Sequence, residues 1–578
     1  MDAERSVDVL KYKLIGDNDT SNAIKTILKN RKIDDWNKYI NLSTANRNTY
    51  KNLNYIDEAV ELFDKHFQAK DPIGILMDND DDGVKSATLM YKYIKSLDEY
   101  YDVQVYVHKK NKSHGLVDRD FEIGNIKLLI VPDAGTNDIE EHCLLNENGI
   151  SCICLDHHHA AVDIMKSPAI IVNNQTSPLY NNKDCCGASI TLEFCRALDE
   201  FYWEDISDNF LDLVAVANVC DIMNLTSFET RAVVNEGLNK INNKMLKQII
   251  KAQDFSMKGK INPHTVGFYV GPLVNAFIRL ATYEERQLLV KAFCEIEDET
   301  FLHTKRGQDF PMEENIYEHV VRLMISYKGK QDRMRKKAQP ILTAKGNKTD
   351  KVAIIDATGI IDTGLTGVVA VKVAEDLNVP TLLLQRKDNE TYGGSGRNID
   401  NSPIEDFRAL VDDCPYVDWA NGHAGAFGIQ IPNTNIEATR RWFNEQLADV
   451  SMNKVYLVDF VIDVENLSTP FIHEIDKHNW LWGTGLKEPK VAIENIIIQR
   501  SDIHIQGKNF NSVAFMVDDI KFVKFNMTEN DPLLEWVSAW DGDDGDTIEV
   551  NVVCEVSINE YQGMYTPQVI IIDSEIIN

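Results

Sequence analysis

The chain has 578 residues, 44% of them hydrophobic, and a formal net charge of −30 at pH 7. It is too long for one hydrophobic core and is expected to divide into about three or four domains. This charge excludes a protein that coats nucleic acid by bulk attraction, but it leaves room for a local basic channel.

The first residues are polar and acidic, unlike a signal peptide, and no apolar run reaches the roughly 20 residues that span a bilayer. Ten cysteines show no paired CxxC spacing suited to zinc, so they are expected to be reduced thiols. The composition, rich in Asn, Lys and Ile, is compatible with a bacterial or phage origin. These features predict a cytoplasmic protein of a bacterial or phage-infected cell, without membrane contact.

The first informative segment is ILMDNDDDGVKSATLM, residues 75–90. Its apolar start predicts a buried strand, and the spacing of apolar residues after the acidic turn predicts a helix. The turn at 78–83 also matches the opening of an EF-hand calcium loop, but the twelfth position holds Leu89 where a bidentate glutamate is needed. The order strand, acidic turn, helix is therefore favoured over a calcium-binding helix–loop–helix.

The same pattern returns further along the chain. The apolar run IKLLIVP ends at Asp133, and ISCICL ends at Asp156, with His157 and His158 directly after it. Helical segments lie between these runs, which is typical of an α/β fold with a parallel sheet, whose ligand site lies at the carboxyl ends of the strands. A further buried segment, NFLDLVAVANVC, leads to Asp221. One such aspartate is usually a cap or turn residue, but four converging acidic ends predict a site.

The chemistry expected of this site is metal binding. Many carboxylate oxygens with one or two imidazoles suit Mn²⁺ or Mg²⁺ better than a thiolate-seeking metal. The number of carboxylates predicts two divalent ions that share a bridge, an arrangement that stabilises the attacking and leaving oxygens in phosphoryl transfer.

In this order, the segments resemble the DHH phosphoesterase superfamily, and within it the RecJ-type exonucleases specific for single-stranded DNA. DNDDDGVKS, PDAG, LDHHHA and LDLVAVANVCDIMNL resemble the DHH motifs, GGSGRNID and NGHAGAFGIQI resemble a DHHA1 domain, and INEYQGMYTPQVIIID resembles an OB-fold. The resemblance implies a parallel-sheet DHH domain, a connecting helix, an α/β DHHA1 domain and an OB-like β-barrel. The implied boundaries are an N-terminal extension (1–55), a DHH catalytic domain (56–240), a helical connector (241–345), a DHHA1 domain (346–450) and an OB-like domain (451–578).

The resemblance also implies roles for individual residues. Asp156 and His158 stand where the family orients its ligands and contacts the phosphate, and His423 stands where a histidine faces the metals across a cleft. Asn275 and Arg279 resemble residues that contact DNA. The implied metal ligands are Asp78, Asp80, Asp82, Asp133, His157 and Asp221.

Ser395, Gly396 and Arg397 resemble the loop that receives a terminal 5′-phosphate. The physical reason offered by the sequence is that neighbouring glycines leave backbone N–H groups open, while arginine grips phosphate bidentately. Three positions depart from the family pattern: Asp81 replaces a frequent alanine, Asn421 a glycine and Leu273 an arginine. These departures concern DNA contacts and local charge more than the ligand set.

The function implied is hydrolysis of single-stranded DNA from the 5′ end to 5′-mononucleotides, by in-line attack of a metal-activated water, in recombination, repair or replication. Two basic segments, 244–260 and 328–340, are candidate parts of a DNA channel or solvated helix faces. The expected partners are single-stranded DNA and a single-strand-binding protein or helicase, with the chain as a monomer. The alternatives are a DHH phosphodiesterase of short oligonucleotides or cyclic dinucleotides, and an inactive DHH scaffold of a replication complex.

Overall fold

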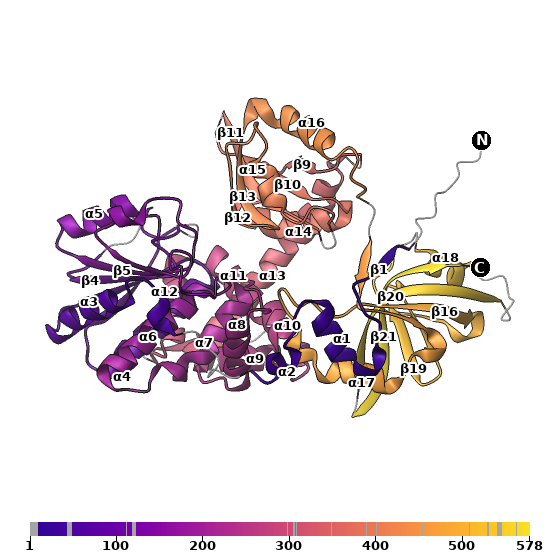
Figure 1. Cartoon of the computed structure of the whole chain (residues 1–578), viewed down its shortest axis with the longest axis horizontal. Helices are drawn as coiled ribbons and strands as arrows, with labels where there is room; N and C mark the ends of the chain where they lie inside the picture. The colour runs from indigo at the N-terminus through magenta and orange to yellow at the C-terminus, as the bar shows by residue number, and fades with distance from the viewer. Residues whose placement is uncertain are drawn as a thin grey trace. The chain divides into compact units, whose positions relative to one another are not determined.

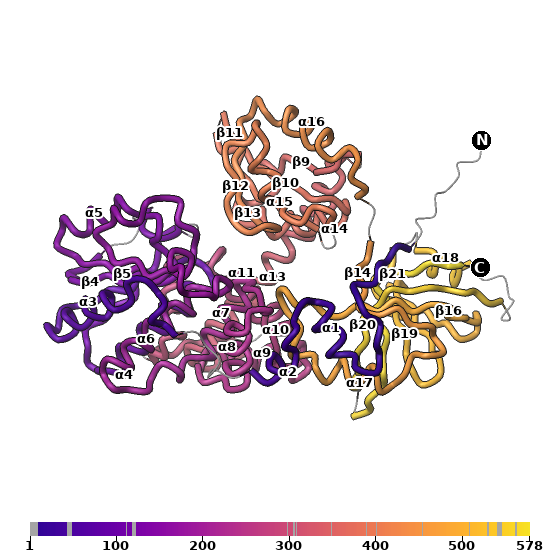
Figure 2. The backbone as a smooth tube through the Cα atoms, viewed as in Figure 1, coloured from indigo at the N-terminus to yellow at the C-terminus, as the bar shows by residue number. Residues whose placement is uncertain are grey.

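The chain forms two compact units in a computed structural model (Figures 1 and 2). The first unit consists of Asp35–Gly329 with Trp480–Lys487, and the second of Met1–Asp34, Lys330–Asn479 and Glu488–Asn578. The structure describes residues 10–42, 49–110, 113–117, 123–297, 299–304, 307, 309–347, 349–388, 390–399, 402–452, 455–507, 509–528, 531–539, 546–561 and 563–577.

The centre of the first unit is a five-stranded parallel sheet with strand order β3-β2-β4-β5-β6. Because β3 and β4 lie on opposite sides of β2, the winding direction changes between β2 and β4. In open parallel sheets, ligand sites lie outside the carboxyl ends of the strands at such a switch point. The strands are β2 (Ile73–Met77), β3 (Val103–Val107), β4 (Leu128–Pro132), β5 (Ser151–Asp156) and β6 (Ile170–Asn173).

Helices cover both faces of this sheet (Figure 1). Side chains alternate along each strand, so Ile75 and Ile153 join the large core with α3, α4 and α6, whereas Leu76 and Cys154 join a smaller core with α5. Covering both faces explains why the strands are nearly continuous apolar runs in the sequence. The helices are α3 (Ile56–Gln68), α4 (Asp81–Leu97), α5 (Ile139–Glu147) and α6 (Gly187–Tyr202).

The rest of the first unit is mainly helical. Helices α7 (Leu211–Cys220) and α11 (Gly271–Leu280) both contact α4, which places their ends near the carboxyl edge of the sheet. The long helix α13 (Ile316–Thr343) continues into the second unit from Lys330. The other elements are α2 (Trp36–Ile40), α8 (Phe228–Asn239), α9 (Lys244–Met257), α10 (Pro263–Thr265), the π-helix Val266–Val270, α12 (Tyr283–Phe293), β7 (Thr300–His303) and β8 (Met312–Asn315).

The second unit contains a mixed five-stranded sheet with order β12-β13-β11-β10-β9. Only β9 and β10 pair in parallel, and the other neighbours are antiparallel. Its elements are β9 (Ala353–Asp356), α14 (Thr366–Leu377), β10 (Thr381–Arg386), β11 (Thr391–Arg397), α15 (Phe407–Asp412), β12 (Trp419–His423), β13 (Ala426–Pro432) and α16 (Ile436–Gln446).

A seven-stranded sheet, ordered β15-β16-β20-β21-β19-β18-β17, forms the C-terminal part of the second unit. The N-terminal strand β1 (Tyr12–Leu14) pairs with β14 (Tyr456–Val458), and Arg31, just after α1 (Ala23–Asn30), forms a 2.6 Å ion pair with Asp459. The remaining elements are β15 (Phe460–Asp463), α17 (Thr469–Lys477), β16 (Val491–Gln499), β17 (His504–Gln506), β18 (Ser512–Val517), β19 (Ile520–Lys524), α18 (Pro532–Ser538), β20 (Thr547–Tyr561) and β21 (Met564–Ile576).

The fold confirms the predicted α/β class and the parallel sheet that carries the acidic strand ends. Within the described residues, no helix has both the length and the apolar content to cross a membrane.

Candidate active site

The first acidic segment joins β2 to α4. Asp78 follows the buried strand, and Asp80 caps the helix, because its carboxylate accepts a 2.9 Å hydrogen bond from the Gly83 N–H. The predicted order strand, acidic turn, helix is confirmed, although α4 already begins at Asp81, inside the predicted turn. A strand before the turn excludes the helix–loop–helix of a calcium-binding loop.

Asp82 lies in the first turn of α4 and faces the start of α6. Its carboxylate accepts hydrogen bonds from the N–H groups of Gly187 (2.6 Å) and Ala188 (2.9 Å) and from the Ser86 hydroxyl (3.1 Å). The positive end of the α6 dipole therefore stabilises this charge. A carboxylate has about four lone-pair positions, so Asp82 can still serve as a ligand.

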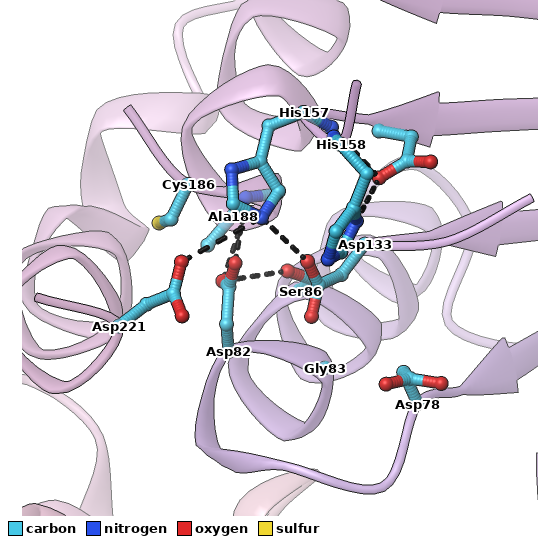
Figure 3. A network of polar contacts seen from close by, with 12 residues as sticks. Asp78, Asp82, Gly83, Ser86, Asp133, His157, His158, Cys186, Ala188 and Asp221 are labelled. Carbon is cyan, nitrogen blue, oxygen red and sulfur yellow. Dashed lines mark hydrogen bonds and ion pairs between the residues drawn. The ribbon is translucent and has the colours of Figure 1, made fainter. Parts of the chain in front are cut away.

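Asp133 follows β4 and is only 1% exposed, with a left-handed backbone (φ 66°). Among the described residues, none donates a hydrogen bond to either of its carboxylate oxygens. His157 Nε2 lies 3.3 Å from Asp133 Oδ1 and 3.6 Å from Oδ2 of Asp221, the C-cap residue of α7 (Figure 3). Three separate segments thus meet around one imidazole.

The structure brings all six predicted ligand residues together. Ligand atoms of Asp82, His157 and Asp221 lie within 4.8 Å of one another, and the same is true of Asp78, Asp80 and Asp133. The contact between Asp133 and His157 joins these two groups. Two neighbouring groups of three are the arrangement expected for two cations that share a bridge.

The site carries more negative charge than the protein compensates. Burial and the charges of Asp82 and Asp80 raise the pKa of Asp133 well above its ordinary value. Burial and the charges of Asp78 and Asp82 raise the pKa of Asp80 to about 6. Carboxylates this close cannot all ionise at low cost without a positive charge among them, so the donor set is suited to divalent cations.

Asp156, at the end of β5, is satisfied within the protein. It accepts hydrogen bonds from the N–H groups of Thr136 (3.0 Å) and His157 (2.7 Å), and its Oδ1 lies 2.7 Å from His158 Nδ1. Burial alone would raise the pKa of Asp156, but His158 and these hydrogen bonds hold it below its ordinary value. This geometry fits the predicted orienting role for Asp156.

His114 is a site residue that the sequence analysis missed. Its Nδ1 lies 2.9 Å from Oδ2 of Asp78, while the Gly115 N–H donates to the other oxygen at 3.0 Å. The imidazole also meets the His158 ring edge-to-face, with the centroids 5.1 Å apart. Attraction to Asp78 raises the pKa of His114 to about 10. No strand ends at His114, so strand-end reasoning could not find it.

Asp81, which replaces the alanine frequent in the first motif of the family, forms an ion pair and so does not add an uncompensated charge to the site. Its carboxylate forms a buried ion pair with Lys85 one helical turn later, and the Lys85 ammonium lies 4.8 Å from the centre of the Phe293 ring. The i, i+4 spacing was visible in the sequence and could have predicted the pair.

The predicted DNA-contacting residues of the first unit lie on α11. Arg279 is solvent-accessible and Asn275 is half-buried. The protein around the guanidinium lowers the pKa of Arg279, and the attraction of Asp80 opposes this shift. Arg279 is therefore within electrostatic reach of the acidic site.

The remaining predicted site residues lie in the second unit, and one expectation there is wrong. Ser395, Gly396 and Arg397 do not form a loop but belong to β11, which is paired on both sides with β10 and β13. A Cβ on Gly396 would lie 2.2 Å from the Phe427 ring, so this glycine allows close packing and does not leave a backbone N–H open. His423 ends β12 and is exposed.

Two family models match this chain and define its class. The N-terminal domain of the DHH family matches residues 72–218, which include the acidic ends of β2, β4 and β5 and stop just before Asp221. The RecJ OB domain matches residues 458–573. The chain is thus a DHH-family protein with an OB domain, as the motifs and the C-terminal strands predicted.

The chain belongs to the RecJ-like family of single-strand DNA-specific exonucleases. It is 34% identical, over 98% of both chains, to the SPbeta prophage-derived single-strand DNA-specific exonuclease YorK of Bacillus subtilis. It is 24% identical, over 90% of this chain and 63% of the relative, to the exonuclease RecJ of the same species. RecJ from Thermus thermophilus, solved with Mn²⁺, shares the fold with a TM-score of 0.73 at 18% identity, over 96% of this chain and 76% of that chain.

Proposed function

We propose that this protein degrades single-stranded DNA from the 5′ end and releases 5′-mononucleotides with the help of divalent metal ions. Membership of the RecJ-like family supports the exonuclease activity and the substrate. The observation that carries the metal-dependent chemistry is Asp133, a buried carboxylate that lies beside other carboxylates and has no hydrogen-bond donor among the described residues. Degradation of single strands would serve recombination, repair or replication.

The residues at the acidic edge fit two divalent cations, Mn²⁺ or Mg²⁺. RecJ from Thermus thermophilus has been solved with each of these ions. Oxygen-rich ligands with one imidazole suit such hard cations, and the bare oxygens of Asp133 are available to them. When bound, two ions supply an activated water and neutralise charge on the attacking and leaving oxygens. The residues that would hold them are Asp78, Asp80, Asp82, Asp133, His157 and Asp221.

Two histidines would bind the scissile phosphate, and an arginine the phosphate next to it. Asp156 fixes His158 through Nδ1, which leaves Nε2 for a phosphate oxygen, and the side chain is 43% exposed. Asp78 fixes His114 in the same way, through Nδ1. Arg279, close to Asp80, would add a charged donor for the neighbouring backbone phosphate.

In the second unit, Ser395 and Arg397 would receive the terminal 5′-phosphate. They alternate with Gly396 on β11 and so lie on the same face of the sheet, against the start of α14. A Cβ on Gly367, in the first turn of α14, would lie 2.4 Å from Arg397 Nη2 and 3.5 Å from Ser395 Oγ. A guanidinium, a hydroxyl and the positive end of a twelve-residue helix together suit a phosphate. His423 is proposed to act at the same substrate.

The test uses linear single-stranded DNA with a 5′ label, blunt duplex DNA and circular single-stranded DNA, each incubated with Mn²⁺. The expected first product from the linear strand is the labelled mononucleotide, while the duplex and the circle persist. Labelled oligonucleotides as first products, or cutting of the circle, would contradict a pocket for a strand end. Hydrolysis of short oligonucleotides alone would favour the phosphodiesterase alternative, and no hydrolysis of any substrate would favour the inactive scaffold.

A further inference from the structure

A second group of metal-ligand atoms lies away from the carboxylates. The imidazole of His142 and the thiols of Cys152 and Cys154 place one ligand atom each within 4.8 Å of one another. The three side chains are 1%, 4% and 0% exposed, respectively. None of them takes part in the proposed hydrolysis.

The secondary structure builds this group directly. Cys152 and Cys154 are two residues apart on β5, so both side chains point to the same face of the sheet, the face that α5 covers. His142 projects from α5 onto this face. The CxC spacing in a strand, completed by a histidine from a helix, escapes a search for paired CxxC motifs.

The distances suit a tetrahedral site. The two sulfur atoms are 3.9 Å apart, and Nε2 of His142 lies 3.3 Å from Sγ of Cys154. With Zn–S near 2.3 Å and Zn–N near 2.0 Å, two ligand atoms of a tetrahedral zinc site are separated by roughly 3.5–3.8 Å. The separation of the two sulfur atoms and that of Cys154 Sγ from His142 Nε2 therefore lie within a few tenths of an ångström of these values, and the third pair lies within 4.8 Å.

The histidine is held as a zinc ligand would be. Its Nδ1 lies 2.9 Å from the Ser167 hydroxyl oxygen, which leaves Nε2 to face the thiols. Hydrogen bonding at one ring nitrogen commonly fixes a metal-ligating histidine through the other. Burial lowers the pKa of His142 to about 4, so the ring is neutral at physiological pH, as a ligand must be.

Charge balance favours Zn²⁺ over a monovalent soft metal. Two thiolates and a divalent cation sum to zero, which suits a core whose other members include Leu129, Val131 and Leu145. Without metal, the same atoms would form a hydrogen-bonded chain of neutral groups, because contact with Cys152 and burial raise the pKa of the Cys154 thiol. Binding of zinc would displace the thiol protons.

We propose that His142, Cys152 and Cys154 form a structural zinc site that ties α5 to β5. These side chains supply three of the four ligands of a tetrahedral site. The site lies directly behind the second acidic motif, because a Cβ on Gly135 would be 2.7 Å from Cys154 Sγ. Zinc there would fix the turn that carries Asp133.

The experiment uses the full chain, produced in medium in which Co²⁺ replaces zinc so that the metal enters during folding. Cobalt bound by thiolates gives an intense near-ultraviolet charge-transfer band, which cobalt bound only by carboxylates and imidazole lacks. The expected result is this band in the unaltered protein, its loss in Cys152→Ser and Cys154→Ser, and one cobalt ion fewer per chain in each variant. The matched control is Cys195→Ser, a buried cysteine of the large core, which should keep the band.

A folded protein without the band would overturn the proposal. So would a band that survives both serine variants, or one that disappears in Cys186→Ser, since Cys186 lies beside Asp82 and Asp221 and would place the thiolate at the carboxylate site. If one serine variant fails to fold, the other and His142→Gln carry the test. The readout does not depend on DNA hydrolysis, so it stands apart from the proposed exonuclease function.

Discussion

Asp133 and Asp156 end neighbouring parallel strands, β4 and β5, and each is 1% exposed, yet their surroundings are opposite. Asp156 accepts backbone N–H groups and holds His158, and its pKa lies below the ordinary value. Asp133 accepts no hydrogen bond from the part of the chain that the structure describes, and burial with neighbouring charges raises its pKa. At these two strand ends, the hydrogen bonds that the carboxylate already accepts distinguish Asp156, which holds His158, from Asp133, whose oxygens are open to a cation. Residue type and strand position cannot make this distinction.

The largest effect is expected from Asp133→Asn, which keeps the size of the side chain and removes its charge. Hydrolysis of single-stranded DNA in Mn²⁺ should fall to background. Asp133 belongs to one of the two groups of metal ligands and contacts His157 of the other, so its loss should weaken both cation sites. The melting temperature of the metal-free protein should not fall, since one of several repelling charges disappears. Asp163→Asn, an exposed helix cap in the same unit, is the control and should retain full activity.

A smaller loss is expected from Asp156→Asn, which removes an orienting charge and no ligand. Asp156 holds the side chain of His158, which is not one of the metal ligands, and the loss of such an orienting partner typically costs about 10- to 100-fold in activity. The loss should appear in kcat, with Mn²⁺ affinity nearly unchanged, in rate measurements over a range of Mn²⁺ concentrations. A loss of Mn²⁺ affinity as large as that of Asp133→Asn would erase the distinction between the two carboxylates.

The effect of Arg397→Ala should depend on the substrate. A charge-assisted hydrogen bond contributes about 1.5–3 kcal/mol, or about ten- to a hundredfold in binding. The variant should lose this factor on 5′-phosphorylated DNA and much less on 5′-hydroxyl DNA, measured as kcat/KM on each. Arg386→Ala, on the neighbouring strand β10, is the matched control. Equal losses on both substrates would count against a 5′-phosphate site.

The pH dependence of stability should show the uncompensated charge. Because the pKa of Asp80 is raised from 3.8 to about 6 in the folded protein, the folded state binds more protons than the unfolded state between these values. The ionisation of Asp80 therefore lowers the free energy of unfolding as the pH rises from about 4 to about 6, and its effect is constant above pH 6. Metal-free Asp80→Asn keeps the helix cap and should gain stability over the unaltered protein across this window. The measurement is thermal unfolding. If the melting temperature of Asp80→Asn were no higher than that of the unaltered protein, the proposed repulsion among the carboxylates would be contradicted.

The acidic edge could be predicted because the strands of a parallel sheet all run in the same direction and end at the same edge. Each apolar run ends at the same edge, so Asp78, Asp133 and Asp156 had to meet there. Which of them lacks hydrogen bonds depends on the N–H groups of other turns, which no single run reveals. His114 was invisible for the same reason, since its contact with Asp78 joins two loops that follow different strands.

The glycine-rich segment was harder to interpret. GGSGR is typical of a phosphate-binding loop, but Gly396 serves close packing against Phe427 inside a paired strand. Local sequence cannot show that two other strands flank it. The alternation of Ser395 and Arg397 around that glycine was available, and it predicts the shared face on which both side chains lie.

The central claim is that the acidic edge around Asp133, whose two oxygens have no hydrogen-bond donor among the described residues, holds two divalent ions. Its most direct test is to titrate metal-free protein with Mn²⁺ and to follow the free ion by electron paramagnetic resonance. The prediction is two tightly bound ions per chain whose signals are broadened by each other, with tight binding lost in Asp133→Asn and kept in Asp163→Asn. Binding of no ion, or unchanged binding of two ions in Asp133→Asn, would contradict it.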